Sequence, residues 1–233
     1  MGLSERHLSV ADAGSGGADG DHAAAYRYGA VLLLVFVLLV FEIVAPDADW
    51  SRAVAFALEA AALLVVVSTS RARSEIRRVR ALVVSIGALL VVVGVASGAL
   101  PLGLTFLLSG LLAAAVPLAL IRGLVRLTRS QGVTIYAVAG ALAIYLLLGL
   151  LFAWAISFVS DVDSTPYFVQ AGVTMGDRVY FSLATLTTTG YGDFTPATSV
   201  GHALAVVEML LGQLYLVTVI GILVGNLARG DRE

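Results

Sequence analysis

The chain alternates between long runs of apolar residues and short polar stretches. Six apolar runs each reach 18 residues or more, and a helix that crosses a membrane needs about 20. In lipid the backbone must satisfy its own hydrogen bonds, so helix is expected even where Val and Ile are frequent. The pattern therefore predicts six membrane-spanning helices, over residues 28–45, 53–70, 81–100, 102–121, 133–159 and 199–227.

The composition agrees with a membrane environment. Hydrophobic residues make up 59% of the chain and charged residues 13%, whereas soluble domains have about 45–50% and about 25%. The chain contains no cysteine, which excludes disulfides and thiolate metal sites. Residues 1–27 are small, polar and rich in glycine, so we expect a disordered cytoplasmic tail. The predicted fold class is thus an all-α, multi-pass membrane protein.

The arginines predict the orientation of the chain. The stretch 71–80 contains five arginines and the stretch 122–132 contains three. With six spans, these two stretches and both termini lie on one side of the membrane. Cytoplasmic loops carry an excess of basic residues, so both termini are expected in the cytoplasm, with the protein in the cell membrane. The net charge of −2 gives no reason to expect a nucleic-acid partner.

The fifth and sixth spans are separated by a longer segment, residues 160–198, with a composition of its own. Within it, residues 178–186 read RVYFSLATL, an amphipathic run too short to cross a bilayer. Asp177 precedes this run and is predicted to be its N-cap. The chain then continues as TTTGYGDFTP, residues 187–196. These features predict a re-entrant half-helix whose C-terminal end leads into a non-helical strand.

The glycines of this strand allow a backbone that meets an ion directly. Gly190 and Gly192 can adopt conformations that are closed to residues with a Cβ atom. Several such strands around one axis would present rings of carbonyl oxygens that replace the hydration shell of a cation. Thr188 can add a hydroxyl at the inner end, and Tyr191 is expected to turn away and pack on the half-helix. Asp193 would raise the local cation concentration at the outer end.

The motif TTTGYGD between two spans resembles the selectivity filter of the potassium channel superfamily. The resemblance covers about residues 133–227 and includes the half-helix, both flanking spans and a proline after the filter, Pro196. It implies a homotetramer embedded in lipid, with K⁺ as the permeating ion and no other cofactor. Thr189 departs from the family pattern, which has Val or Ile there. The resemblance assigns the filter, and K⁺ coordination within it, to Thr188, Thr189, Gly190, Tyr191 and Gly192.

Other residues are predicted to support the filter. Tyr180 and Phe181, at the start of the half-helix, are candidates for an aromatic cuff that braces the strand, together with Asp193. Glu208 lies in the last span near filter depth, where it would brace the filter from behind or add negative charge to the cavity. Gly212 matches the glycine at which the last helix of the family bends, and is the predicted gating hinge.

The first four spans, residues 28–129, are predicted to form a separate helical domain ahead of a pore domain at residues 130–233. They occupy the position of a voltage sensor. However, the fourth span contains no charge, and Arg122, Arg126 and Arg129 follow only at its inner end. A voltage sensor must carry several charges through the field, so strong voltage gating is not expected.

Two further carboxylates interrupt the early spans. Glu42 lies near the outer end of the first and is expected to extend toward the interface. Glu59 lies deeper in the second and is expected to pair or to stay protonated.

The leading hypothesis is therefore a passive potassium channel. A weakly selective cation channel remains open because of Thr189, and a voltage-gated potassium channel remains open because of the four preceding spans. An enzyme is not expected, since the sequence contains no nucleophile–base set, histidine cluster or phosphate-binding loop.

Overall fold

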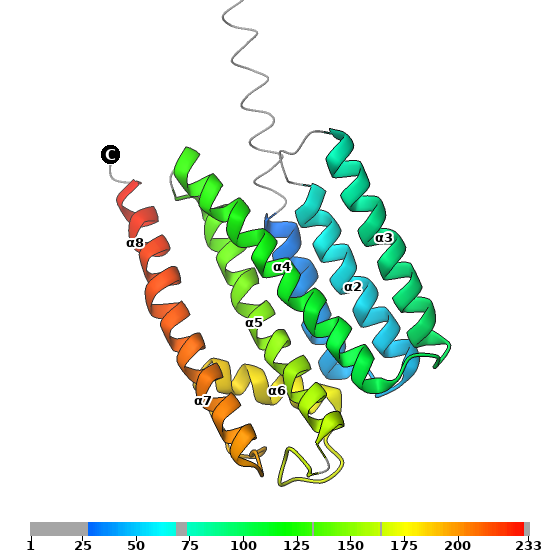
Figure 1. The fold of residues 1–233 in the computed structure, drawn as a ribbon. Coiled ribbons are helices and arrows are strands. Elements are labelled where there is room, and N and C mark those ends of the chain that lie inside the picture. The colour runs from blue at the N-terminus through cyan, green and yellow to red at the C-terminus, as the bar shows by residue number, and fades with distance from the viewer. Residues whose placement is uncertain (1–27, 69–73, 132, 164, 231–233) are drawn as a thin grey trace, which may run out of the picture.

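The computed structural model describes residues 28–68, 74–131, 133–163 and 165–230. The predicted tail at residues 1–27 lies outside these ranges. Within the described ranges the regular structure is helical, apart from one isolated β-bridge between Phe168 and Pro196. The predicted all-α class is thus confirmed for the described part of the chain (Figure 1).

The chain forms a series of long helices with one short helix among them. The described part of the chain begins with an unlabelled helix, called here the first helix, and the labelled elements from α2 onward follow it. Their bounds are Tyr28–Val44 for the first helix, α2 Asp49–Ser68, α3 Ser74–Ala96, α4 Leu102–Gln131, α5 Ile135–Val162, α6 Met175–Leu186, α7 Ser199–Leu214, a π-helical segment η1 Tyr215–Ile220, and α8 Gly221–Gly230.

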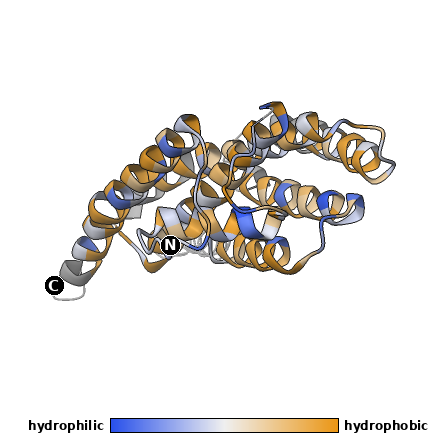
Figure 2. Cartoon of the chain, turned by 90° about the horizontal axis from the view of Figure 1, so that it is seen from below, coloured by the Kyte–Doolittle hydropathy of each residue, from blue (hydrophilic) through white to orange (hydrophobic). Residues whose placement is uncertain are grey.

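The helices pack side by side, and α6 lies across one end of the bundle. Helix α4 packs along α5, α2 contacts both α3 and α4, and α6 contacts both α5 and α7 (Figure 1). The first helix, α2, α4 and α5 share one apolar core, in which Val35, Ala62, Val116 and Leu150 are almost fully buried. Figure 2 shows that apolar residues make up most of each helix, and many large apolar side chains, among them Leu33, Leu90 and Leu118, are exposed, as expected of a protein surrounded by lipid.

Three of the described helices are long and apolar enough to cross a membrane. They are Leu102–Ile121, Ile135–Val162 and Ser199–Leu227, which correspond to the last three predicted spans. The first helix and Val84–Ala96 are apolar but shorter. Three spans of the predicted six are therefore supported by length and composition, and the protein is a membrane protein.

The helices differ from the sequence prediction in several places. The expected loop at 71–80 is wrong from residue 74 onward, because α3 begins at Ser74. Helix α4 continues ten residues beyond 121 to Gln131, since the intervening Leu and Arg residues favour helix. It therefore extends past the expected domain boundary at 129/130. The last predicted span is one continuous helical stretch, but it contains the π-helical segment η1.

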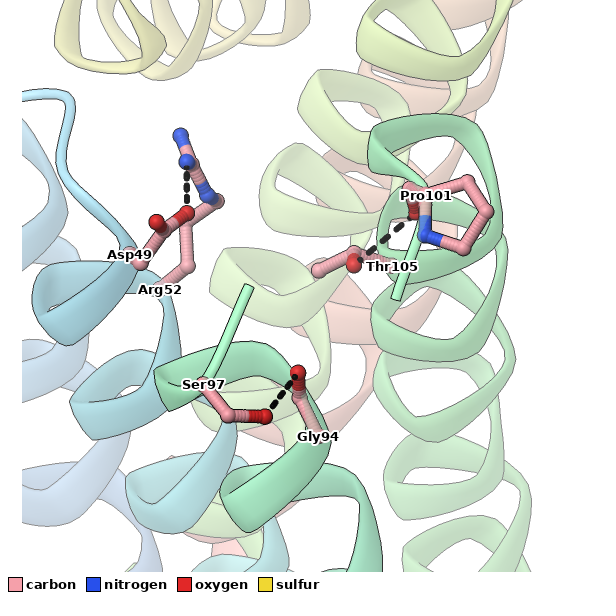
Figure 3. Close-up of polar contacts among 6 residues, drawn as sticks. All are labelled: Asp49, Arg52, Gly94, Ser97, Pro101 and Thr105. Atoms are coloured by element: carbon pink, nitrogen blue, oxygen red, sulfur yellow. Dashed lines mark hydrogen bonds and ion pairs between the residues drawn. The ribbon is translucent and has the colours of Figure 1, made fainter. Parts of the chain in front are cut away.

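The turn between α3 and α4 is fixed by local hydrogen bonds. Gly98 adopts a positive φ of 67° just after α3, a conformation that glycine allows. The Ser97 hydroxyl donates to the Gly94 carbonyl at 3.2 Å, and the Thr105 hydroxyl donates to the Pro101 carbonyl at 3.2 Å (Figure 3). The two helices are thus joined by a short, well-defined connection.

Candidate functional site

The short helix α6 has a complete N-terminal cap. Thr174 is the N-cap residue; its side chain accepts from the Asp177 amide, and the Asp177 carboxylate accepts from the Thr174 amide at 2.8 Å. The prediction that Asp177 is the N-cap was wrong by three residues, because Thr174 and Asp177 form a reciprocal capping box. As a result α6 begins at Met175, earlier than the predicted start at residue 178.

The other end of α6 is held between α5 and α7. The Tyr145 hydroxyl on α5 donates to the carbonyl of Leu186, the last residue of α6, at 3.0 Å. On the opposite side, a Cβ atom added to Gly212 of α7 would lie 2.2 Å from the same carbonyl oxygen. Sequence reasoning missed Tyr145, because a single tyrosine in an apolar span has many possible partners. The position of the strand that follows α6 is therefore set from two sides.

That strand has an alternating backbone. Positive φ angles occur at Thr188 (59°), Gly190 (54°) and Gly192 (78°), and not at the two residues between them. Such angles were expected at the two glycines, where they cost little. At Thr188 the left-handed conformation costs roughly 1–2 kcal/mol, so the surrounding structure must impose it. The amides of Thr189 and Gly190 donate to the Ala184 carbonyl at 2.8 and 3.1 Å, which ties the strand to the last turn of α6.

One side of this strand is uncovered in the single chain. Residues 187–193 are all exposed, whereas α6 behind them buries Val179, Ser182 and Leu186 completely. The Thr189 hydroxyl lies 2.9 Å from that of Thr187, which donates to the Leu183 carbonyl at 2.7 Å. The Thr189 side chain thus faces the C-terminal end of α6.

The predicted aromatic supports lie beside the strand. The rings of Tyr180 and Tyr191 are stacked, with centroids 6.2 Å apart and planes 6° from parallel. The Tyr180 hydroxyl donates to the Asp193 carboxylate at 2.8 Å. Phe181 packs edge-on against Phe168 at 5.0 Å. Tyr180 and Asp193 are therefore brought together beside Tyr191, whereas Phe181 packs on the loop that precedes α6.

The sequence prediction missed the contribution of the loop before α6. Tyr167 and Phe168 form an apolar cluster with Phe181 and Ile156, and burial raises the pKa of the Tyr167 phenol. The Ala197 amide donates to the Tyr167 carbonyl at 2.7 Å. The hydroxyl of the same tyrosine donates to the Gly201 carbonyl at 3.2 Å. Adjacent aromatic residues in an otherwise polar loop were the signal that could have revealed this support.

Glu208 is fully buried behind α6. Its carboxyl accepts a short hydrogen bond from the Ser182 hydroxyl of α6. The same hydroxyl lies 2.5 Å from the Gly149 carbonyl of α5, a second acceptor. A hydroxyl carries one hydrogen, so Ser182 can donate fully to only one of these two acceptors at a time. Glu208 therefore links α7 through Ser182 of α6 to α5, as a brace would. Because its side chain is fully buried, it does not line an open cavity.

The two early carboxylates are also buried. Glu59 accepts from the indole N–H of Trp154 on α5 at 2.7 Å, so it is paired as expected. Glu42 is only 6% exposed and one of its oxygens has no hydrogen-bond partner among the described residues. The expectation that Glu42 extends to the interface was therefore wrong, because the neighbouring helices enclose it.

Gly212 lies inside α7, which continues through it without a break. Packing explains the glycine at this position, because a side chain would collide with the Leu186 carbonyl of α6. The regular helical pattern changes only at η1, three residues later, where the Tyr215 hydroxyl donates to the Ala141 carbonyl of α5 at 2.8 Å. The predicted role of Gly212 as a gating hinge stays a prediction.

Comparisons with known proteins find similarity between this region and channel proteins. The family described as "Ion channel" matches residues 144–229. The protein described as "Probable potassium channel protein 2" of Methanocaldococcus jannaschii is 44% identical over 63 residues, which are 27% of this chain and 15% of that protein. The chain thus aligns with only a small part of that relative. No solved structure matches the chain. Residues 144–229, which contain the strand, α6, part of α5 and most of the last helical stretch, are therefore similar to an ion-channel domain, and part of the chain is similar to a probable potassium channel.

Proposed function

We propose that this protein is a potassium-selective channel that conducts K⁺ passively through a filter of backbone carbonyls. The filter comprises Thr188 to Gly192, with Thr188, Thr189, Gly190 and Tyr191 supplying the oxygens that hold the ion. Six spans carry the chain across the cell membrane, and both termini are cytoplasmic.

The observation that carries the proposal is the alternating backbone of this strand. Positive φ angles at residues 188, 190 and 192 alternate with ordinary conformations at 189 and 191. Two amides of the strand are bonded back to α6, so the polar groups on its uncovered side are free to face an ion. Rings of backbone carbonyls are the chemistry that selects K⁺ in channels.

The uncovered side of the strand also supports assembly into a homotetramer. One chain supplies one strand, and residues 187–193 are exposed in it. The stretch Ser199–Leu227 runs from α7 into α8. Only 17% of it is buried in the single chain, and its exposed residues are mostly apolar. Copies arranged around an axis would enclose the ion and cover part of this apolar face. The resemblance to potassium channels implies four copies. Native mass spectrometry of the purified full chain should therefore give a mass of four chains.

Strong voltage gating is not part of the proposal. The apolar window Leu102–Ile121 of α4 contains no charged residue, and moving a charge through the field is what couples opening to voltage, at about 2.3 kcal/mol per charge and 100 mV. We expect an open probability that changes little with voltage.

A weakly selective cation channel is the alternative that Thr189 allows. Its hydroxyl bonds to Thr187 on the side of α6, which argues against a direct effect on the ion and keeps potassium selectivity as the proposal.

Two glycine variants test the filter with a matched control. Gly190 and Gly172 both have a positive φ, 54° and 71°, and a Cβ atom would meet nothing within 4 Å at either position. Alanine therefore imposes a similar backbone strain at both sites, but only Gly190 lies in the proposed filter. In liposomes that contain the purified protein, Gly190→Ala should lose K⁺-selective flux while Gly172→Ala keeps it. Equal flux in both variants would contradict the proposed filter.

A further inference from the structure

The first helix ends against the beginning of α6. A Cβ atom added to Gly176, the second residue of α6, would lie 2.6 Å from the carbonyl oxygen of Ile43. Ile43 belongs to the last turn of the first helix. The carbonyl end of one helix, which is partly negative, therefore meets the amide end of another, which is partly positive. Only glycine at position 176 permits this approach.

A carboxylate from the same segment completes the cap of α6. Both oxygens of Asp47 accept from the amide of Met175, at 3.1 and 3.2 Å. The capping box of Thr174 and Asp177 satisfies the Asp177 amide but leaves the Met175 amide to be satisfied from outside. Asp47 lies 128 residues earlier in the chain, so the first domain supplies a cap that the pore domain does not provide for itself.

Arg178, one turn into α6, contacts the first domain a second time. Its guanidinium lies over the ring of Phe106 of α4, 5.9 Å from the ring centre, within the range of a cation–π interaction. It also lies in the field of the carboxylates of Asp47, Asp161 and Asp177. Its Nε atom is buried and has no hydrogen-bond partner among the described residues. The charge of Arg178 is therefore balanced by groups from several elements around the start of α6.

We propose that Asp47 and Arg178 are positioning residues for the filter, which hold the outer end of α6 against the first helical domain. This inference rests on the proposed function. Helix α6 has 12 residues and leads directly into the filter. At 1.5 Å per residue it is about 18 Å long, so a tilt of about 3° moves one end by about 1 Å. That displacement exceeds the tolerance of roughly 0.5 Å within which a binding constellation must be held.

The expected consequence of removing Asp47 is a less stable conducting filter. Loss of one cap shifts an equilibrium by a factor of roughly five or more. In Asp47→Ala, single-channel recordings of the full chain in planar bilayers should therefore show conducting bursts about five-fold shorter at unchanged unitary conductance. Bound K⁺ stabilises the state that binds it, so raising the external K⁺ concentration should restore the burst length. A defect of folding alone would lower the number of active channels and leave the burst length of each channel unchanged.

The neighbouring loop offers a matched control. Asp49 lies two residues further along, and its carboxylate pairs with Arg52 at 2.5 Å on the surface, without contact to α6 (Figure 3). Asp49→Ala should keep wild-type bursts. Asp47→Asn keeps an oxygen that can accept from the Met175 amide. Its burst length should therefore lie between those of Asp47→Ala and the wild type. Wild-type bursts in Asp47→Ala, or equal shortening in Asp49→Ala, would overturn the inference.

Hydrogen exchange separates this inference from the proposed function. In the purified full chain, Asp47→Ala should exchange the amides of residues 175–178 faster than Asp49→Ala does, whether or not the protein conducts K⁺. Unchanged exchange at these amides would overturn the positioning role even if the wild type is a potassium channel. Faster exchange in a protein that passes no K⁺ would support the cap and reject the channel.

Discussion

Substitution of Gly212 tests the contact that fixes the start of the filter. In Gly212→Ala the new Cβ atom would lie 2.2 Å from the Leu186 carbonyl oxygen and 2.9 Å from a methyl carbon of the same residue. Ordinary contacts between such atoms are about 3.5–4 Å, so α7 and the end of α6 must separate by more than about 1 Å. The obstructing oxygen belongs to the backbone and cannot rotate away. Overpacking of this kind costs about 1–3 kcal/mol or more.

The assay is thermal unfolding of the purified full chain in detergent, together with K⁺ flux in liposomes. For a chain of this size each kcal/mol lowers the melting temperature by about 2–4 °C, so Gly212→Ala should melt several degrees lower and lose much of its flux. Gly225→Ala is the control, because a Cβ atom there meets nothing within 4 Å and alanine favours helix by about 0.5–1 kcal/mol. If Gly212→Ala melted like Gly225→Ala, the packing argument would be refuted. Altered gating at unchanged stability would instead support the hinge.

Three further predictions concern the supports behind the filter. Tyr145→Phe removes the hydrogen bond to the buried Leu186 carbonyl at a cost of about 1–3 kcal/mol, so it should lower the melting temperature measured by intrinsic fluorescence. Glu208→Gln keeps a donor and an acceptor for Ser182 and should retain most K⁺ flux, whereas Glu208→Ala should lose it; the reverse order would contradict the brace. Thr189→Val restores the usual family residue and should leave the ratio of K⁺ to Na⁺ permeability unchanged in bi-ionic recordings, while a change in that ratio would place its hydroxyl at the ion.

The strand at residues 187–193 and its flanking helices could be predicted because their signals are local. A long apolar run predicts a span by itself, and the two glycines around Tyr191 indicate an unusual backbone without reference to the rest of the chain. The positive φ at Thr188 could not be predicted in this way. It depends on hydrogen bonds from the following residues to Ala184, and threonine rarely adopts such an angle by preference.

The supports could be predicted only in part because they depend on tertiary contacts. Glu208 drew attention because a carboxylate in an apolar span is costly. Its partner Ser182 and the capping residue Asp47 look ordinary in the sequence, and their roles come from residues 26 and 128 positions away. The length of α4 was underestimated for a different reason: its arginines indicate the membrane boundary, but they do not end a helix.

The most direct test of the central claim is the reversal potential of the purified full chain in a planar bilayer with opposing K⁺ and Na⁺ gradients. If backbone carbonyls of residues 188–192 select K⁺, the reversal potential should follow the K⁺ gradient alone, by about 59 mV for each tenfold change in concentration. A reversal potential that ignored the K⁺ gradient, or that followed Na⁺ equally well, would contradict the account.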